Sequence, residues 1–138
     1  MKHGFVKVAA ATPDLKVADI RYNTDKIKAV ISDADKADVQ LLVFPELGIC
    51  GYTCGDLFGQ QLLLDGCFAA LKEIADFTRG KKMLVFVGVP VRLGGVLYNC
   101  AAALNDGSAL GSSPKTQLPN YAEFYEKRNF QPYTGENT

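Results

Sequence analysis

Short apolar runs alternate with amphipathic stretches along the N-terminal part of the chain. Residues 5–12 (FVKVAAAT) have the β-rich apolar character of a strand. Residues 39–44 (VQLLVF) form a short continuous apolar run, typical of a strand that is covered on both faces, and residues 83–91 (MLVFVGVPV) form a third predicted strand. The sequence therefore predicts three strands, each separated from the next by enough residues for a helix.

Helical spacing replaces the apolar runs in the two intervening segments. From residue 23 on, one face of a predicted helix carries Ile27, Val30, Ile31 and Ala34. Asn23 or Thr24 is expected to cap its start. A second helix is predicted over residues 61–79, with Gly80 as its stop signal. Its apolar face is expected to hold Leu64, Cys67, Phe68, Leu71, Ile74, Ala75 and Thr78.

Glycine-containing turns then join the later strands. Residues 93–95 (LGG) connect the third strand to a predicted strand at 96–104, and residues 105–107 (NDG) lead to a short strand at 108–111. The predicted order is β-α-β-α-β-β-β, which begins parallel and ends in hairpins. This order indicates one α/β domain whose mixed sheet carries helices on at least one face.

Charge and composition narrow the classes of partner. Fifteen basic residues balance fifteen acidic ones, and no basic run is present. Electrostatics therefore gives no reason to expect nucleic acid or a polybasic membrane contact, and no apolar run approaches the ~18 residues of a membrane span. We expect a cytoplasmic protein that binds small molecules or other proteins.

The residues that could carry chemistry are few. Glu46 directly follows the second predicted strand, at the carboxyl end where open α/β sheets bind ligands. Cys50 and Cys54 follow it closely and are possible partners, whereas Cys67 and Cys100 lie within apolar elements and are expected in the core. With one histidine and no second close cysteine pair, a metal site is not expected. Taken alone, Glu46 is more typical of an exposed loop carboxylate than of a catalytic group.

Two longer strings resemble a known family. Residues 44–52 (FPELGICGY), followed after a hairpin by Lys115, resemble the carbon-nitrogen hydrolase (nitrilase) superfamily. More narrowly, residues 51–58 (GYTCGDLF) and 115–130 (KTQLPNYAEFYEKRNF) are similar to the glutaminase domain of glutamine-dependent NAD synthetases. The resemblance implies that residues 1–138 form the N-terminal half of a nitrilase-like α-β-β-α sandwich, with a mixed sheet and helices on its outer face.

The resemblance also implies roles for particular residues. Glu46 would be the general base, Lys115 would stabilise the tetrahedral intermediate, and Glu123 would be the second acidic residue beside the lysine. Glu126 is close enough in sequence to compete with Glu123 for that place. Residues Tyr52 and Tyr121 would border the glutamine pocket. These types suit amide hydrolysis, since a carboxylate can take a thiol proton and a fixed ammonium stabilises an oxyanion.

In the resembled family the nucleophilic cysteine lies beyond the lysine segment. We therefore expect the nucleophile, and an ATP-dependent synthetase domain that uses ATP and Mg²⁺, to lie outside residues 1–138. The expected function is hydrolysis of glutamine to supply ammonia for amidation of nicotinic acid adenine dinucleotide to NAD, in a homo-oligomer. The 138-residue chain alone is expected to be inactive and, with a sheet face uncovered, to self-associate. A freestanding nitrilase-type amidase and a non-catalytic interaction scaffold are the alternatives.

Overall fold

The order of elements predicted from the sequence is confirmed. The structure is a computed structural model that describes residues 3–121, 124 and 126–135. Its helices and strands are β1 (Val8–Ala10), α1 (Ile20–Lys36), β2 (Leu41–Val43), α2 (Gln61–Phe77), β3 (Leu84–Leu93), β4 (Val96–Asn105) and β5 (Ser108–Pro114). Two short 3-10 helices, η1 (Gly55–Gly59) and η2 (Glu126–Arg128), lie in the loops.

The strands form a single mixed sheet in the order β1-β2-β3-β4-β5. β1, β2 and β3 run parallel, and antiparallel hairpins add β4 and β5. The parallel part places the carboxyl ends of β1 and β2 at the same edge. The loop that carries Glu46 leaves β2 at that edge.

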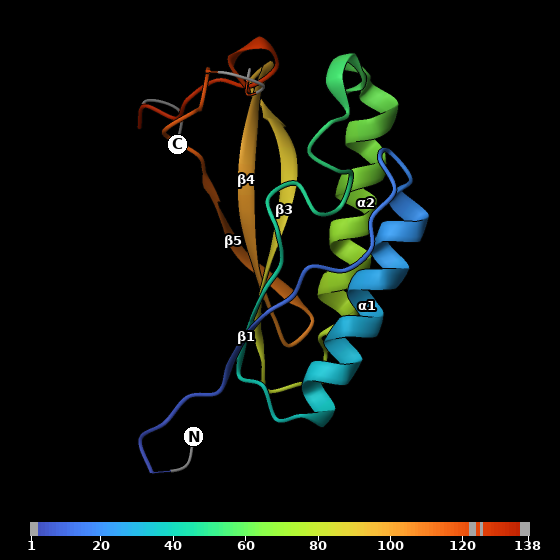
Figure 1. Ribbon diagram of the computed structural model, residues 1–138, viewed down its shortest axis with the longest axis vertical. Coiled ribbons are helices and arrows are strands. Elements are labelled where there is room, and N and C mark those ends of the chain that lie inside the picture. The colour runs from blue at the N-terminus through green and yellow to red at the C-terminus, as the bar shows by residue number, and fades with distance from the viewer. Residues whose placement is uncertain (1–2, 122–123, 125, 136–138) are drawn as a thin grey trace.

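The two faces of the sheet differ sharply in what covers them. Helices α1 and α2 lie side by side on one face (Figure 1). On that face Leu42, Val85, Val87, Ala102 and Leu104 are buried. The strand register places Ala10 beside Val43 and Val43 beside Phe86 on the opposite face. There Val8 is 61% and Val43 41% exposed, so in the described part of the chain this second face is open.

The start of the first helix differs from the prediction. α1 begins at Ile20, because the Asp19 side chain accepts a hydrogen bond from the Tyr22 backbone N–H at 3.0 Å and so caps the helix. Asn23 or Thr24 was expected as the cap, but both are buried inside the helix, and Asn23 has another role. Its amide donates to the backbone oxygens of Lys16 and Ile49, which ties two loops to the helix.

The face of the second helix also differs at one position. Phe68 was expected among the buried residues, yet it is 58% exposed, and the ammonium of Lys72 lies 4.6 Å from its ring centre. Leu63 and Ala70 are buried instead. The predicted helical period was therefore right, but the buried side of α2 is rotated by a fraction of a turn from the side that the sequence predicted.

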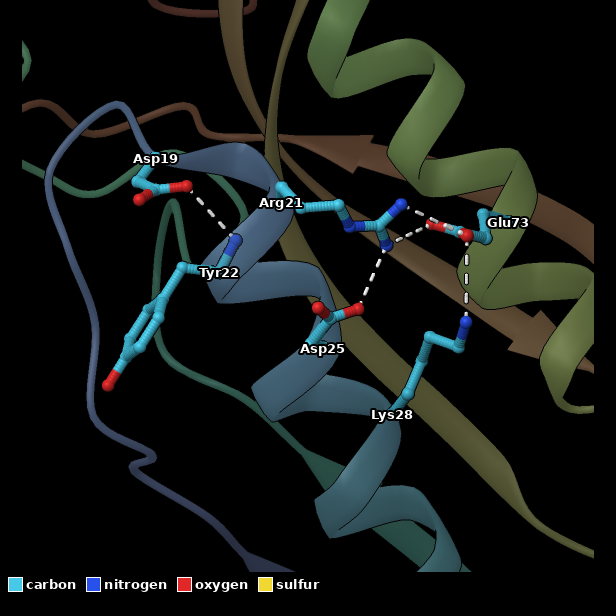
Figure 2. Close-up of polar contacts among 6 residues, drawn as sticks. All are labelled: Asp19, Arg21, Tyr22, Asp25, Lys28 and Glu73. Atoms are coloured by element: carbon cyan, nitrogen blue, oxygen red, sulfur yellow. Dashed lines mark hydrogen bonds and ion pairs between the residues drawn. The ribbon is translucent and has the colours of Figure 1, made fainter.

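Exposed ion pairs join the two helices at their outer side. Arg21 of α1 reaches Glu73 of α2 at 2.7 Å, and Lys28 reaches the same carboxylate at 3.5 Å (Figure 2). The hydrogen bond from Arg21 lowers the pKa of Glu73 below its ordinary value. These side chains are largely in solvent, so packing beneath them contributes more to the helix–helix contact than the charges do. Neither helix in the described part of the chain is long and apolar enough to cross a bilayer.

Candidate active site

The loop after β2 holds Glu46 in place through close backbone contacts. Phe44 donates its backbone N–H to the Phe86 oxygen at 3.0 Å, and Ile49 donates to the Gly88 oxygen at 3.3 Å. Leu47 adopts a left-handed backbone with φ of 52° and is fully buried. Such a conformation costs free energy in a non-glycine residue and persists only where its surroundings impose it. The Glu46 backbone is therefore fixed on both sides.

Glu46 lies on the open face of the sheet, where two other polar side chains meet it. Asn99 of β4 points to the same face as Ala101, because side chains alternate along a strand. The Asn99 amide donates a hydrogen bond to Oε1 of Glu46. Lys115 follows β5, and its ammonium lies 2.7 Å from the same oxygen. Three segments that are distant in sequence thus converge on one carboxylate oxygen.

A second carboxylate holds the lysine from its other side. Lys115 Nζ lies 2.9 Å and 3.2 Å from the two carboxylate oxygens of Glu126. The Glu126 side chain is only 4% exposed, and it also accepts a hydrogen bond from the Tyr52 hydroxyl at 2.9 Å. Glu126 therefore occupies the position beside the lysine. Glu123, which the resemblance suggested for that position, lies outside the described residues.

The two carboxylates determine the protonation of Lys115. Burial disfavours its ammonium, but the hydrogen bonds from it to Glu46 and Glu126, with their charges, outweigh that effect. The pKa of Lys115 is consequently raised above its ordinary value. The lysine is a permanently charged group at neutral pH, which suits it to stabilise negative charge and not to act as a base or nucleophile.

A pocket of about 330 Å³ opens beside these groups. Its wall combines Glu46, Asn99 and Lys115 with apolar side chains of the open sheet face, including Val43 and Phe86. The two tyrosines suggested by the resemblance are not among the residues that line it, and both pack edge-to-face on Phe124, at centroid distances of 6.2 Å for Tyr52 and 5.7 Å for Tyr121. Tyr52 is tied to the site through Glu126, whereas Tyr121 is 68% exposed.

The four cysteines all belong to the core. The prediction that Cys67 and Cys100 are buried is confirmed, and Cys50 and Cys54 are buried as well. Cys100 borders the pocket, but it alternates with Asn99 along β4 and so faces the helices. Burial raises the pKa of the Cys100 thiol to about 11, which keeps it protonated. Within the described residues, no group of three or more His, Cys, Asp or Glu side chains could hold a metal ion.

Asn99 was missed by reasoning from the sequence. The signal for it was present, since an amide in the middle of the apolar strand 96–104 must find a partner when it is buried. The Lys115 backbone N–H donates to the Asn99 backbone oxygen at 2.8 Å, so the same residue also positions the lysine segment.

Comparison with known proteins identifies the family. Residues 7–137 match the carbon-nitrogen hydrolase family. The chain belongs to this family. Among carbon-nitrogen hydrolase relatives, a glutamine-dependent NAD(+) synthetase of Mycobacterium bovis is 36% identical over 135 residues, which are 98% of this chain and 20% of that protein. The chain thus spans about a fifth of the length of this curated relative.

Solved structures share the fold of this chain. The crystal structure of a glutamine-dependent NAD(+) synthetase from Cytophaga hutchinsonii superposes with a TM-score of 0.90 at 30% identity, over 95% of this chain and 22% of that chain. An amidase from Nesterenkonia sp. superposes with a TM-score of 0.81 at 24% identity, over 94% of this chain and 48% of that chain. The mixed sheet with its helices is therefore the nitrilase-like α/β fold that the sequence predicted.

Proposed function

We propose that this chain provides the base and the oxyanion-stabilising lysine of a glutaminase site. The site hydrolyses glutamine and supplies ammonia for the ATP-dependent amidation of nicotinic acid adenine dinucleotide to NAD. The observation that carries the proposal is the ion-paired cluster of Glu46, Lys115 and Glu126, in which Glu46 and Lys115 line one pocket. The names of the relatives support glutamine as the source of the amide nitrogen.

Glu46 is the base in this proposal. Among the described contacts, Asn99 and Lys115 both donate to Oε1. Oε2 is therefore the oxygen to which a thiol can give its proton. The resulting thiolate attacks the glutamine amide carbon, and the leaving nitrogen takes the proton held by Glu46 as the C–N bond breaks, so that ammonia leaves and a thioester forms. Water then hydrolyses the thioester to glutamate and restores the thiol.

Lys115 acts when the amide carbonyl becomes an oxyanion. Its ammonium is held between Glu46 and Glu126, so it need not reorganise as charge develops. A fixed donor of this kind typically contributes about 3 kcal/mol to the transition state. Glu126 does not touch the reacting atoms in this scheme. It holds the lysine charged and in place, and Tyr52 in turn orients Glu126.

The nucleophile is a cysteine that lies outside residues 1–138 and packs on the open face of the sheet. Burial of Cys50, Cys54, Cys67 and Cys100 in the core supports this part of the proposal. The pocket opens on that same face, where a covering segment would meet Glu46 and Lys115. ATP and Mg²⁺ belong to a separate synthetase part, and no residue of this chain is assigned to them.

The test compares glutamine with free ammonium as nitrogen source in the longest product of the gene. Replacement Lys115→Met should lower glutamine-dependent NAD formation at least about 100-fold and leave ammonium-dependent formation intact. Lys127→Met, an exposed lysine of the same segment, is the matched control and should behave like the wild type. Glutamine hydrolysis by the 138-residue chain alone, or full glutamine-dependent activity in Lys115→Met, would overturn the proposal.

A further inference from the structure

Asn99 is a buried amide in the middle of an apolar strand, and the proposed glutaminase chemistry gives it no role of its own. It lies on β4 with 3% of its surface exposed, between the buried residues Tyr98 and Cys100. An amide that is buried without partners costs free energy, so buried amides in proteins are hydrogen-bonded. Asn99 also lines the pocket to which Glu46 and Lys115 belong. Its hydrogen bonds therefore bear on the site.

The side chain of Asn99 holds Glu46 in one arrangement. A carboxylate only accepts hydrogen bonds, so the NH2 group of the Asn99 amide, and not its oxygen, faces Oε1 of Glu46. β4 pairs with β3 on one side and with β5 on the other, which gives this donor a rigid support. The Glu46 side chain is 39% exposed, so burial alone does not hold it. Its orientation depends on the donors that reach Oε1.

The main chain of Asn99 holds the other member of the ion pair. The Asn99 backbone oxygen accepts a hydrogen bond from the Lys115 backbone N–H at 2.8 Å. The Lys115 ammonium in turn lies 2.7 Å from Oε1 of Glu46. One residue thus contacts both members of the pair. Because the contact to Lys115 uses only backbone atoms, a replacement of the Asn99 side chain removes the contact to Glu46 alone.

The two donors to Oε1 differ in what happens when Glu46 takes up a proton. The ammonium of Lys115 attracts the carboxylate by charge, and that part of the attraction is lost when the carboxylate becomes a neutral acid. The Asn99 amide is neutral, so its hydrogen bond depends less on the charge of Glu46. Asn99 is then the donor that keeps the protonated Glu46 in place. In the proposed reaction, this protonated form delivers the proton to the leaving nitrogen.

We propose that Asn99 is the positioning residue of the base. It keeps Oε1 occupied in both protonation states of Glu46, so the proton arrives from the thiol and leaves to the departing nitrogen through Oε2. Asn99 itself does not touch the reacting atoms. The inference rests on the proposed glutaminase function and adds a residue that controls its proton transfers. Loss of the amide slows the chemical step and leaves glutamine binding unchanged.

The first test removes the amide in the longest product of the gene. Asn99→Leu removes the donor and keeps a similar volume and the backbone oxygen. We expect kcat with glutamine to fall about 10- to 100-fold, KM to change less than about threefold, and ammonium-dependent NAD formation to stay intact. The matched control is Asn105→Leu on the same strand. Its amide donates to the Met83 oxygen at 3.0 Å, and Asn105 does not line the pocket, so kcat should stay at the wild-type value.

The second test keeps the shape of the side chain and changes its charge. Asn99→Asp places a carboxylate against Glu46, and two adjacent carboxylates resist being ionised together. In the described part of the chain, Lys115 is the charged group in contact with Glu46, and Glu126 lies on the far side of that lysine. Both stay in place. The acid limb of the pH profile of kcat/KM should therefore move up by about one pH unit or more, and Asn105→Asp should not move it.

The results separate this inference from the function on which it rests. A wild type that cannot use glutamine would contradict the glutaminase function, and the role of Asn99 with it. With an active wild type, three results would each overturn the role of Asn99 alone: an unchanged kcat in Asn99→Leu, a raised KM at unchanged kcat, or an equal loss in Asn105→Leu. If Asn99→Leu does not fold, the pH profile of Asn99→Asp decides, and a profile that matches the wild type would overturn the inference.

Discussion

Gly88 of β3 packs directly against the backbone of Leu47, the residue that follows Glu46. A Cβ added to Gly88 would overlap the Leu47 nitrogen and come within 2.7 Å of the Pro45 oxygen. Because the obstacle is backbone on both sides, no side-chain rotation can relieve it. The position of Glu46 thus depends on the absence of a side chain on the neighbouring strand.

Replacement Gly88→Ala should push the Glu46 loop away from β3. We expect unfolding free energy to fall by about 1–3 kcal/mol, as for other overpacked sites. Urea unfolding followed by circular dichroism measures this change. The control is Gly111→Ala in β5, where an added Cβ meets nothing within 4 Å and the backbone is not left-handed. Equal urea midpoints of unfolding for Gly88→Ala and Gly111→Ala would contradict the close approach at Gly88.

Glu126 should control the protonation of Lys115. Glu126→Gln keeps the shape of the side chain but removes one of the two charges that raise the lysine's pKa. The pKa of Lys115 should therefore fall toward or below its ordinary value, as burial of the ammonium is less well offset. Carbon-detected NMR of labelled lysine side chains during a pH titration measures the pKa directly.

The matched control for that experiment is Glu73→Gln. Glu73 also contacts two cationic side chains, Arg21 and Lys28, but it lies on the outer side of the helices (Figure 2). The replacement Glu73→Gln should therefore leave the pKa of Lys115 unchanged. An unchanged Lys115 pKa in Glu126→Gln would mean that the buried carboxylate does not act on the lysine as its 2.9 Å contact implies.

The raised pKa of Lys115 also has a consequence for stability at alkaline pH. A lysine whose folded-state pKa lies above its unfolded value of 10.5 stabilises the fold at all pH values below 10.5. This contribution is lost as the pH rises through the folded-state pKa. Between about pH 9 and pH 12, the wild type should therefore lose more unfolding free energy than Lys115→Met.

Other groups titrate in the same range, including Cys100 with its pKa of about 11, but they are common to both proteins. The difference between the wild type and Lys115→Met in how unfolding free energy varies with pH therefore isolates the contribution of the lysine. Lys127→Met, with its exposed lysine, should follow the wild-type curve. If unfolding free energy fell equally with pH in the wild type and in Lys115→Met, the lysine's ion pairs would not stabilise the fold as predicted.

The sequence was informative where the hydrophobic period is long and regular. The order of helices and strands along the chain and the burial of Cys67 followed from it, because burying an apolar stripe dominates the energy of these elements. It misplaced the cap of α1, since both Asp19 and Asn23 are good capping residues and only the fold decides which one turns inward.

The candidate site could be predicted from the sequence only in part. Glu46 was predicted from its place after a strand, but its contact with Lys115 required the resemblance, because the two residues lie 69 positions apart. Which acidic residue contacts Lys115 depends on the path of the irregular segment that follows it. That segment has no hydrophobic period from which its path could be predicted. The contact with Glu126 emerged only from the three-dimensional structure.

The open face of the sheet should make the 138-residue chain associate with itself. Val8 and Val43 lie on this face and are largely exposed, while the helices cover only the other one. Contiguous apolar surface of this kind, beside the short edge strand β1, favours association between sheets. Size-exclusion chromatography with light scattering should therefore show a mass above 14.9 kDa that increases with concentration.

Charge on the open face should reverse that association. The double replacement Val8→Lys and Val43→Lys should shift the chain toward a monomer, because it would place like charges on every copy at the contact. Leu62→Lys and Phe68→Lys change two exposed apolar residues on α2, on the helical side, and form the matched control. If the control pair disperses the oligomer and the sheet pair does not, the helices and not the open face mediate association. A wild-type chain that remains monomeric over the concentration range would contradict association altogether.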